Sequence, residues 1–150
     1  VGKLKAVITQ NIDGLHQMAG SREVLELHGL VHRNYCMKCG RFFDLDYVVS
    51  SSGVPRCDKC GGIVKPDVVL YEESLDTDII NKSVRYIAGA EALIVAGTSL
   101  TVYPAAGLIR YFSGKHLVLI NKTPTPYDSL ATLVINESIG ETLKKACPEL

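Results

Sequence analysis

The chain has 150 residues, of which 47% are hydrophobic and 21% are charged, and its 16 Lys and Arg balance its 16 Asp and Glu. This composition is typical of a globular protein, and the length suits one domain with a small insert. Zero net charge argues against nucleic acid or an anionic membrane as the main partner, and no apolar run approaches the roughly 20 residues of a membrane span.

The first predicted strand, residues 5–9, is apolar and is followed at once by the polar residues Gln10, Asn11 and Asp13. The glycine at position 14 permits a sharp turn there. In open α/β sheets ligands bind at the carboxyl ends of the strands, so we expect this polar run to face a ligand. Downstream, His28 stands between an apolar residue and a glycine.

The rest of the chain alternates predicted strands and helices. We expect a short helix over residues 12–19, extended segments over 24–27, 30–35 and 63–71, and a local helix over 44–50. Further along we expect helices over 76–88 and 104–112, strands over 92–96, 116–120 and 133–135, and a final helix that starts with a Ser138–Glu141 capping box. This alternation predicts an α/β fold with a parallel sheet.

Four of the five cysteines form two close pairs, Cys36 with Cys39 and Cys57 with Cys60, and 17 residues separate the pairs. This spacing is typical of a structural zinc site, in which two knuckles complete a tetrahedron and leave no position for water. The polar neighbours of both pairs disfavour unligated core thiols, and two pairs favour zinc over a redox dithiol. Ligand cysteines indicate a reducing compartment, so we expect a cytoplasmic protein. Cys147 stands alone, and we expect it to pack a helix.

Three predicted strands end in small or polar residues, at positions 10–13, 97–99 and 121–123. Three such ends on one sheet edge suggest a nucleotide crevice, although the chain has no glycine-rich phosphate loop of either common type. His28 is either a satisfied core histidine, the usual state of a lone histidine, or a general base, which its polar surroundings favour. We interpret the other three histidines as surface or packing residues.

A series of longer motifs follows the same order as in one known family. They are TQNIDGLH from Thr9, ELHG from Glu26, the two cysteine pairs, KPDVVLYEE from Lys65, GTSL from Gly97, VYPAA from Val102, and Ile120-Asn121. Together they cover nearly the whole chain, and the chain resembles a sirtuin.

Sirtuins are NAD-dependent protein-lysine deacylases with a Rossmann-like domain and a small zinc domain. The resemblance therefore implies a Rossmann-like parallel sheet over residues 1–35 and 61–150 and a zinc-binding module over residues 36–60. It also implies NAD as cofactor, structural zinc, an acylated lysine of a protein or peptide as partner, and nicotinamide and O-acyl-ADP-ribose as products. Neither nucleic acid nor a membrane is an expected partner.

The resemblance also assigns roles to single residues, with His28 as the general base for the ribose hydroxyls. The cofactor residues it assigns are Gln10 near the nicotinamide ribose, Asn11, Ile12 and Asp13 around the nicotinamide, Gly97, Thr98 and Ser99 at the phosphate and adenosine side, Asn121 at the adenosine ribose, and Ile139 over the adenine. The substrate backbone, bound as an added strand, is assigned to Val69, Tyr71, Glu73, Val102 and Tyr103.

The sequence departs from the family pattern in two places. The N-terminal piece with the first strand and a Gly-Ala-Gly-x-Ser phosphate turn is missing, so we expect an incomplete sheet and a chain that is inactive alone. Glu72 also stands where the family usually has glycine, and we expect its side chain to crowd the substrate or change its charge preference.

Alternative functions remain open at this point. The chain could be a zinc-stabilised module that binds a lysine-containing peptide without turnover, which the missing phosphate turn favours. Mono-ADP-ribosyl transfer from NAD to protein is a second possibility within the enzyme class. A nucleic-acid-binding zinc ribbon is a third, and zero net charge and the α/β remainder argue against it.

Overall fold

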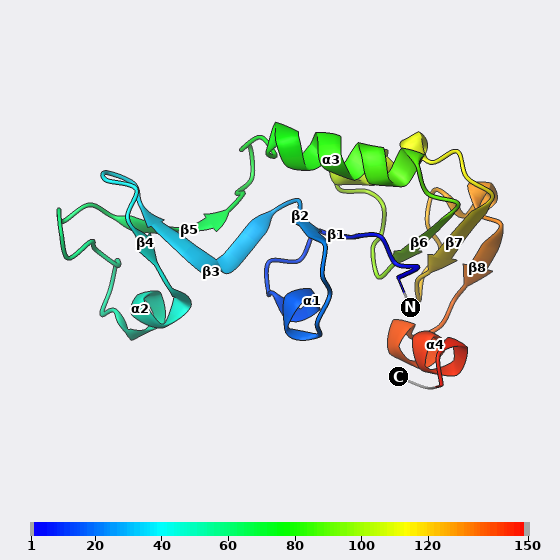
Figure 1. Cartoon of the computed structure of the whole chain (residues 1–150), viewed down its shortest axis with the longest axis horizontal. Helices are drawn as coiled ribbons and strands as arrows, with labels where there is room; N and C mark the ends of the chain where they lie inside the picture. The colour runs from blue at the N-terminus through cyan, green and yellow to red at the C-terminus, as the bar shows by residue number, and fades with distance from the viewer. Residues whose placement is uncertain (1, 149–150) are drawn as a thin grey trace. The chain divides into compact units, whose positions relative to one another are not determined.

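A computed structural model describes residues 2–148 of the chain (Figure 1). The chain divides into two compact units, residues 1–80 and 81–150, and each is described by itself. Among the helices of the described residues, none is long and apolar enough to cross a membrane. The sequence-based domain boundaries at residues 36 and 60 stay a prediction.

The first unit opens with two short parallel strands, β1 (Val7–Thr9) and β2 (Val24–Glu26). The first strand was predicted here and begins two residues later than expected. Helix α1 (Leu15–Met18) is much shorter than the predicted helix over residues 12–19. The reason is local, because Gly14 adopts a left-handed φ of 73° and the Asp13 carboxylate accepts a hydrogen bond from the Leu15 N–H, so residues before 15 form a turn.

A three-stranded antiparallel sheet makes up the other part of this unit (Figure 1). Strand β3 (Gly29–Cys36) is central and pairs with β4 (Phe42–Phe43) and β5 (Val64–Val68). Helix α2 (Leu45–Ser50), predicted over residues 44–50, starts where the Asp44 carboxylate accepts a hydrogen bond from the Tyr47 N–H, a typical N-cap. Residues 52–54, which follow α2, are exposed.

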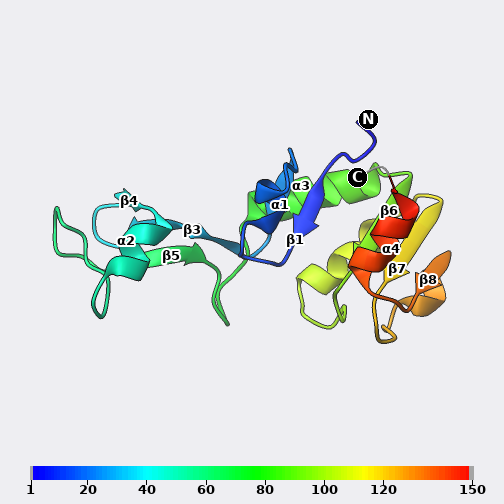
Figure 2. The ribbon, with the colours of Figure 1, turned by 90° about the horizontal axis from the view of Figure 1, so that it is seen from below.

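Helix α3 (Thr77–Ala88) spans the division between the units and matches the predicted helix over residues 76–88. The second unit then holds three parallel strands in the order β6 (Ala92–Ala96), β7 (His116–Ile120) and β8 (Leu133–Ile135), which lie side by side in Figure 2. All three strands and their parallel arrangement were predicted. The central strand β7 supplies the buried residues Leu117, Leu119 and Ile120, and the first two belong to a hydrophobic core with Ala106 and Ile109.

The helices of the second unit differ from the predictions in detail. The segment after Pro104 is a 3₁₀ helix, η1 (Ala105–Tyr111), and a second short one, η2 (Asp128–Leu130), was not predicted. Helix α4 (Ile139–Ala146) starts after Ser138 as expected. The predicted capping box is wrong, because the Ser138 side chain makes no capping hydrogen bond and instead lines a surface pocket. The expected packing role of Cys147 is also wrong, since that residue is exposed.

Candidate functional site

His28 lies between β2 and β3, and its ring is fixed by one backbone contact. Its Nδ1 lies 2.9 Å from the carbonyl oxygen of Gln10, which directly follows β1 in the chain. A carbonyl oxygen can only accept a hydrogen bond, so Nδ1 carries the proton and the lone pair is left on Nε2. A neutral imidazole in this tautomer can take a proton at Nε2, as a general base must.

The polar run after β1 lies beside His28 in the same unit. The Leu27 N–H donates to the carbonyl of Thr9 at 2.9 Å, and the Val31 N–H donates to the carbonyl of Ile12 at 3.0 Å. These bonds hold positions 10–13 against the start of β3. Of the predicted nicotinamide residues in this run, Asn11 and Asp13 are exposed and Ile12 is partly buried. The sequence-predicted base and nicotinamide residues are therefore neighbours.

An ion pair ties the strand that leads to His28 to the adjacent sheet. Glu26 is buried, and its Oε2 lies 2.7 Å from Arg33 Nη2. The same guanidinium reaches Asp67 on β5, with 2.9 Å between Nε and Oδ2. Gln17 also donates a hydrogen bond to Glu26. The buried carboxylate is thus paired and hydrogen-bonded, as a charge in the interior must be.

The predicted substrate segment starts next to His28 and then turns. The Val69 N–H donates to the His28 carbonyl at 3.1 Å, so a backbone hydrogen bond joins the two residues. Strand β5 ends at Val68, and the extended segment expected through residue 71 gives way to a turn. Glu73 closes this turn, because its N–H donates to the Leu70 carbonyl at 3.1 Å and its carboxylate accepts the Leu70 N–H at 2.8 Å.

Two other residues of that turn bear on substrate binding. The Tyr71 side chain is completely exposed. Glu72, which stands where the resembled family usually has glycine, adopts a φ of 71°, a left-handed conformation that favours glycine. The backbone has therefore kept a glycine-like geometry at a position that carries a carboxylate here.

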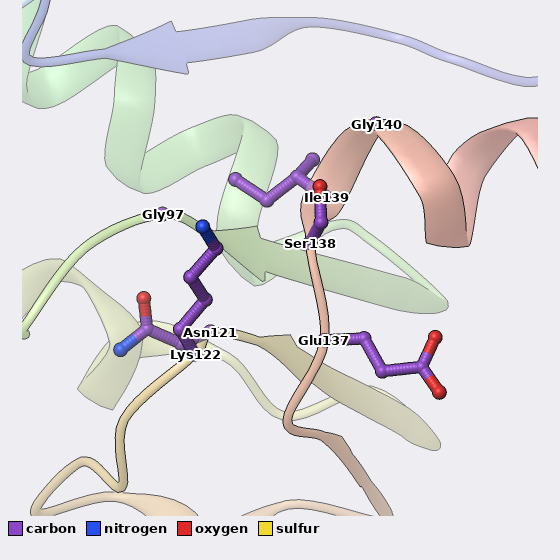
Figure 3. Close-up of a pocket in the computed structure, with 7 residues that line it drawn as sticks. All are labelled: Gly97, Asn121, Lys122, Glu137, Ser138, Ile139 and Gly140. Carbon is purple, nitrogen blue, oxygen red and sulfur yellow. The ribbon is translucent and has the colours of Figure 1, made fainter.

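An open pocket lies at the carboxyl ends of β6 and β7 in the second unit (Figure 3). It brings together three of the predicted cofactor residues, Gly97, Asn121 and Ile139. In Figure 3 the Ile139 side chain extends toward Gly97, and a Cβ added to Gly97 would lie 2.7 Å from Ile139 Cδ1. Gly97 has a φ of 66°, so both its conformation and its missing side chain shape the pocket.

Four other residues line the same pocket. Lys122 lies in the polar run 121–123 that the sequence analysis marks, Ser138 was predicted only as a helix cap, and no sequence pattern marks Glu137 or Gly140. Lys122 extends toward Gly97, whereas the Glu137 carboxylate points away from it (Figure 3). Lys122 and Glu137 each lie two residues beyond the end of a predicted strand, and Ser138 and Gly140 lie at the start of the last helix. These positions are the one signal that could have found Glu137 and Gly140. Two predicted residues, Thr98 and Ser99, do not line this pocket and bond within their own loop, to the Leu100 N–H and the Thr101 hydroxyl.

The two predicted substrate residues of the second unit lie in the loop before η1. The Val102 carbonyl accepts a hydrogen bond from the Ala106 N–H at 2.9 Å. The Tyr103 hydroxyl lies 3.1 Å from that of Tyr127, and its ring is largely exposed. The predicted catalytic, cofactor and substrate residues are therefore divided between the two units.

The four paired cysteines converge in the first unit. Their sulfur atoms all lie within 4.8 Å of one another, with 3.5 Å between Cys36 and Cys60 and 3.7 Å between Cys39 and Cys57. Zinc–sulfur bonds of about 2.3 Å in a tetrahedron place the sulfur atoms about 3.8 Å apart, which these distances match. The cluster is therefore consistent with a structural zinc site, as the spacing predicts.

The protonation of the sulfurs also fits a cation site. Burial opposes ionisation of Cys36, but backbone N–H groups of Cys39 and Lys38 outweigh it and lower the pKa of Cys36 to about 6. A backbone hydrogen bond from Gly62 acts in the same sense on Cys60, yet the neighbouring Cys36 sulfur and burial raise the pKa of Cys60 to about 12. Adjacent sulfurs cannot all carry charge unless a cation compensates them.

Comparison with known proteins identifies the family. The Sir2 family profile matches residues 1–104 of this chain. The chain belongs to the Sir2 family. An NAD-dependent protein deacetylase of Clostridium acetobutylicum is 67% identical over 144 residues, which are 95% of this chain and 59% of that protein. A second one, from Clostridium tetani, is 64% identical over 151 aligned positions, which are all of this chain and 61% of that protein.

Solved Sir2 structures share the fold. One, of Sir2 with a p53 peptide and NAD⁺, is 41% identical and superposes with a TM-score of 0.89 over 97% of this chain and 63% of that one. Another, of Sir2Tm bound to a propionylated peptide, is 42% identical with a TM-score of 0.90 over 97% of this chain and 64% of that one. The chain spans about 60% of the length of the curated relatives it matches. It thus has a partial α/β sirtuin fold, and the predicted resemblance is confirmed.

Proposed function

We propose that this Sir2-family chain contributes to NAD-dependent deacylation of acyl-lysine in proteins, with nicotinamide and O-acyl-ADP-ribose as products. Its relatives at 64% and 67% identity are NAD-dependent protein deacetylases. The observation that carries the proposal is the hydrogen bond from His28 Nδ1 to the Gln10 carbonyl. It sets the tautomer in which Nε2 can accept a proton, next to the residues proposed to surround the nicotinamide.

When bound, NAD supplies an electrophilic ribose carbon and the nicotinamide leaving group. The proposed task of His28 is to remove a proton from a ribose hydroxyl at Nε2. Asn11, Ile12 and Asp13 are proposed to line the nicotinamide pocket, with Gln10 near its ribose. The support for this arrangement is the set of backbone bonds that holds the run against His28.

The adenosine half of the cofactor is proposed to occupy the pocket around Gly97. Ile139 offers an apolar surface for a flat base, and the side-chain amide of Asn121 can bond ribose hydroxyls. Thr98 and Ser99 are proposed to approach the phosphate side through their loop. An apolar side chain beside polar groups supports the proposal of an adenosine site in this pocket.

The residues proposed to contact the substrate backbone are Val69, Tyr71, Glu73, Val102 and Tyr103. Support comes from the Val69–His28 bond, which places this segment beside the proposed base. The cysteine cluster is proposed to hold zinc for folding alone, because four sulfur ligands leave no open position for water. Such ligands need to stay reduced, which supports a cytoplasmic location.

The test is a mass-spectrometric product assay with NAD and an acetyl-lysine peptide, run on this chain and on a protein of the relatives' full length that contains it. We expect O-acetyl-ADP-ribose from the full-length protein and loss of that product in its His28→Ala variant. His116→Ala serves as the control, because His116 is an exposed histidine on β7 that is given no role in the site.

Other outcomes separate the alternatives. Transfer of the ADP-ribosyl group from NAD to the peptide, without deacetylation, would indicate mono-ADP-ribosyl transfer. Peptide binding without any product from either protein would indicate a binding module. Product from the 150-residue chain itself would show that the chain alone holds a complete site.

A further inference from the structure

Tyr103 is held at its hydroxyl by a second tyrosine that the sequence patterns do not mark. The hydroxyls of Tyr103 and Tyr127 lie 3.1 Å apart, which is within hydrogen-bond distance. The Tyr103 side chain is 60% exposed, whereas Tyr127 is 7% exposed. The contact therefore joins a side chain on the surface to one in the core.

Tyr127 is a fixed support for this contact. Its ring belongs to the hydrophobic core around Leu117 and Leu119 of β7. Its backbone is held at both sides, because its N–H donates to the Thr125 hydroxyl at 3.3 Å and its carbonyl accepts the Leu130 N–H at 3.0 Å. A side chain whose ring and backbone are both held can present its hydroxyl in one place.

A charged group, the Arg110 guanidinium of η1, lies near this pair. The hydrogen bond with Tyr103, and then the Arg110 guanidinium, lower the pKa of Tyr127. The contact with Tyr127 raises the pKa of Tyr103. Either hydroxyl can donate to the other, so loss of either one removes the bond.

We propose that Tyr127 is a positioning residue for the peptide substrate, which holds Tyr103 and its loop in the conformation that receives the substrate backbone. This inference rests on the proposed function, which assigns Val102 and Tyr103 to the substrate. An exposed tyrosine without such a bond populates several rotamers, and the entropy lost when one of them is fixed on binding weakens affinity. The bond to Tyr127 fixes the rotamer of Tyr103 before the peptide binds, so this entropy is not lost on binding.

The Tyr127→Phe variant tests this, because it keeps the ring and removes one hydroxyl. In a full-length protein that contains the chain, we expect the KM for an acetyl-lysine peptide to rise roughly 3- to 10-fold, the range of one hydrogen bond. The kcat and the KM for NAD stay unchanged. Peptide affinity without NAD, measured by fluorescence anisotropy, falls by the same factor. Tyr103→Phe has the same effect, and the double variant is no worse than either single one, since all three lack the same bond.

The matched control is Tyr111→Phe, which removes the hydroxyl of an exposed tyrosine at the end of η1, and which leaves peptide affinity unchanged. An unchanged melting temperature for Tyr127→Phe shows that its core is intact. If the wild-type protein neither deacetylates nor binds the peptide, the proposed function fails and the inference with it. If the wild type binds and Tyr127→Phe binds equally well, or if the two single losses add in the double variant, only the inference is overturned.

Discussion

The cysteine cluster and the pocket around Gly97 are built in opposite ways. In the cluster four side-chain sulfurs lie within 4.8 Å of one another, and Cys36 and Cys57 are buried. The pocket is shaped instead by a glycine without a side chain, one apolar side chain from Ile139, and polar groups that reach into solvent. The cysteine cluster depends on the sulfur atoms that its side chains supply. The pocket depends on the space that the backbone leaves at Gly97.

This difference determines how each site responds to change. The cluster draws its ligands from one short stretch, residues 36–60, so removal of a single ligand affects the whole site. The pocket draws its wall from the segments that follow β6, β7 and β8 and from the start of α4, so we expect it to be sensitive to added volume at Gly97, where a Cβ would meet Ile139. Both statements can be tested by substitution.

The largest effect is expected from Cys57→Ala. It removes one ligand of four, and zinc binding contributes about 10–16 kcal/mol of folding free energy in small zinc modules. We expect loss of bound zinc and of the β3–β4–β5 sheet, measured by elemental mass spectrometry and NMR. Cys147→Ser is the control, since that cysteine is exposed and outside the cluster. One zinc per chain in Cys57→Ala would contradict the prediction.

The next largest effect is expected at Gly29, the residue after His28, where the surrounding backbone leaves no room for a side chain. A Cβ at Gly29, which has a φ of 78°, would overlap the carbonyl oxygen of Asp67. We expect Gly29→Ala to lower the free energy of unfolding by about 3 kcal/mol or more, measured in urea. Gly20→Ala measures the cost of the left-handed conformation alone, because Gly20 has a φ of 83° and a Cβ there would meet nothing within 4 Å. We expect this variant to lower the free energy of unfolding by about 1–2 kcal/mol. Equal losses in the two variants would refute the steric argument.

A smaller effect is expected in the pocket itself. Gly97→Ala places a methyl group 2.7 Å from Ile139 Cδ1, so we expect roughly 10-fold weaker binding of ADP-ribose, or about 1.4 kcal/mol, by calorimetry on the full-length protein. Adding Ile139→Val removes that Cδ1 and recovers part of the affinity. Gly140→Ala adds a methyl in the same pocket with nothing within 4 Å and leaves the affinity nearly unchanged. Identical losses in both alanine variants would contradict the prediction.

The smallest effect is expected from Arg41→Ala at the cluster. Arg41 pairs with Asp58 at 2.6 Å, linking the two knuckles, but the side chains are 48% and 53% exposed. Exposed ion pairs contribute about 1 kcal/mol or less, so zinc affinity in a chelator competition falls about fivefold at most. Asp58→Asn gives a loss of the same size. A much greater loss would mean that the knuckles need this pair in order to form.

The parts of the fold that were predicted correctly are set by neighbours in the chain. Strands β6 and β7 are apolar runs that end in glycine or asparagine, and residues 44–50 carry their own cap at Asp44. The cysteine cluster follows from two pairs with fixed spacing. Each of these features is determined within a few residues, which is the range over which sequence patterns are informative.

The parts that were missed depend on where individual side chains point. The turn at Leu70 is closed by the carboxylate of Glu73, only three residues away, which also lies 3.6 Å from Lys65. The apolar run of residues 68–70 favours an extended segment there and does not show that this carboxylate turns back. Tyr127 gains its contact from a residue 24 positions away. At the pocket, sequence patterns find Asn121 at a strand end but cannot indicate whether the side chain of Lys122 faces the same space.

The cysteine cluster also affects how the chain can be cut and rejoined. Two ligands precede the exposed residues 52–54 and two follow them. A zinc ion held by all four would act as a cross-link across this loop, in addition to the pairing of β3 with β5, so cleavage by a protease at residues 52–54 would leave two polypeptides that stay associated. The loop is therefore a place where a foreign domain can be inserted, with both of its ends anchored by metal rather than by the peptide between them.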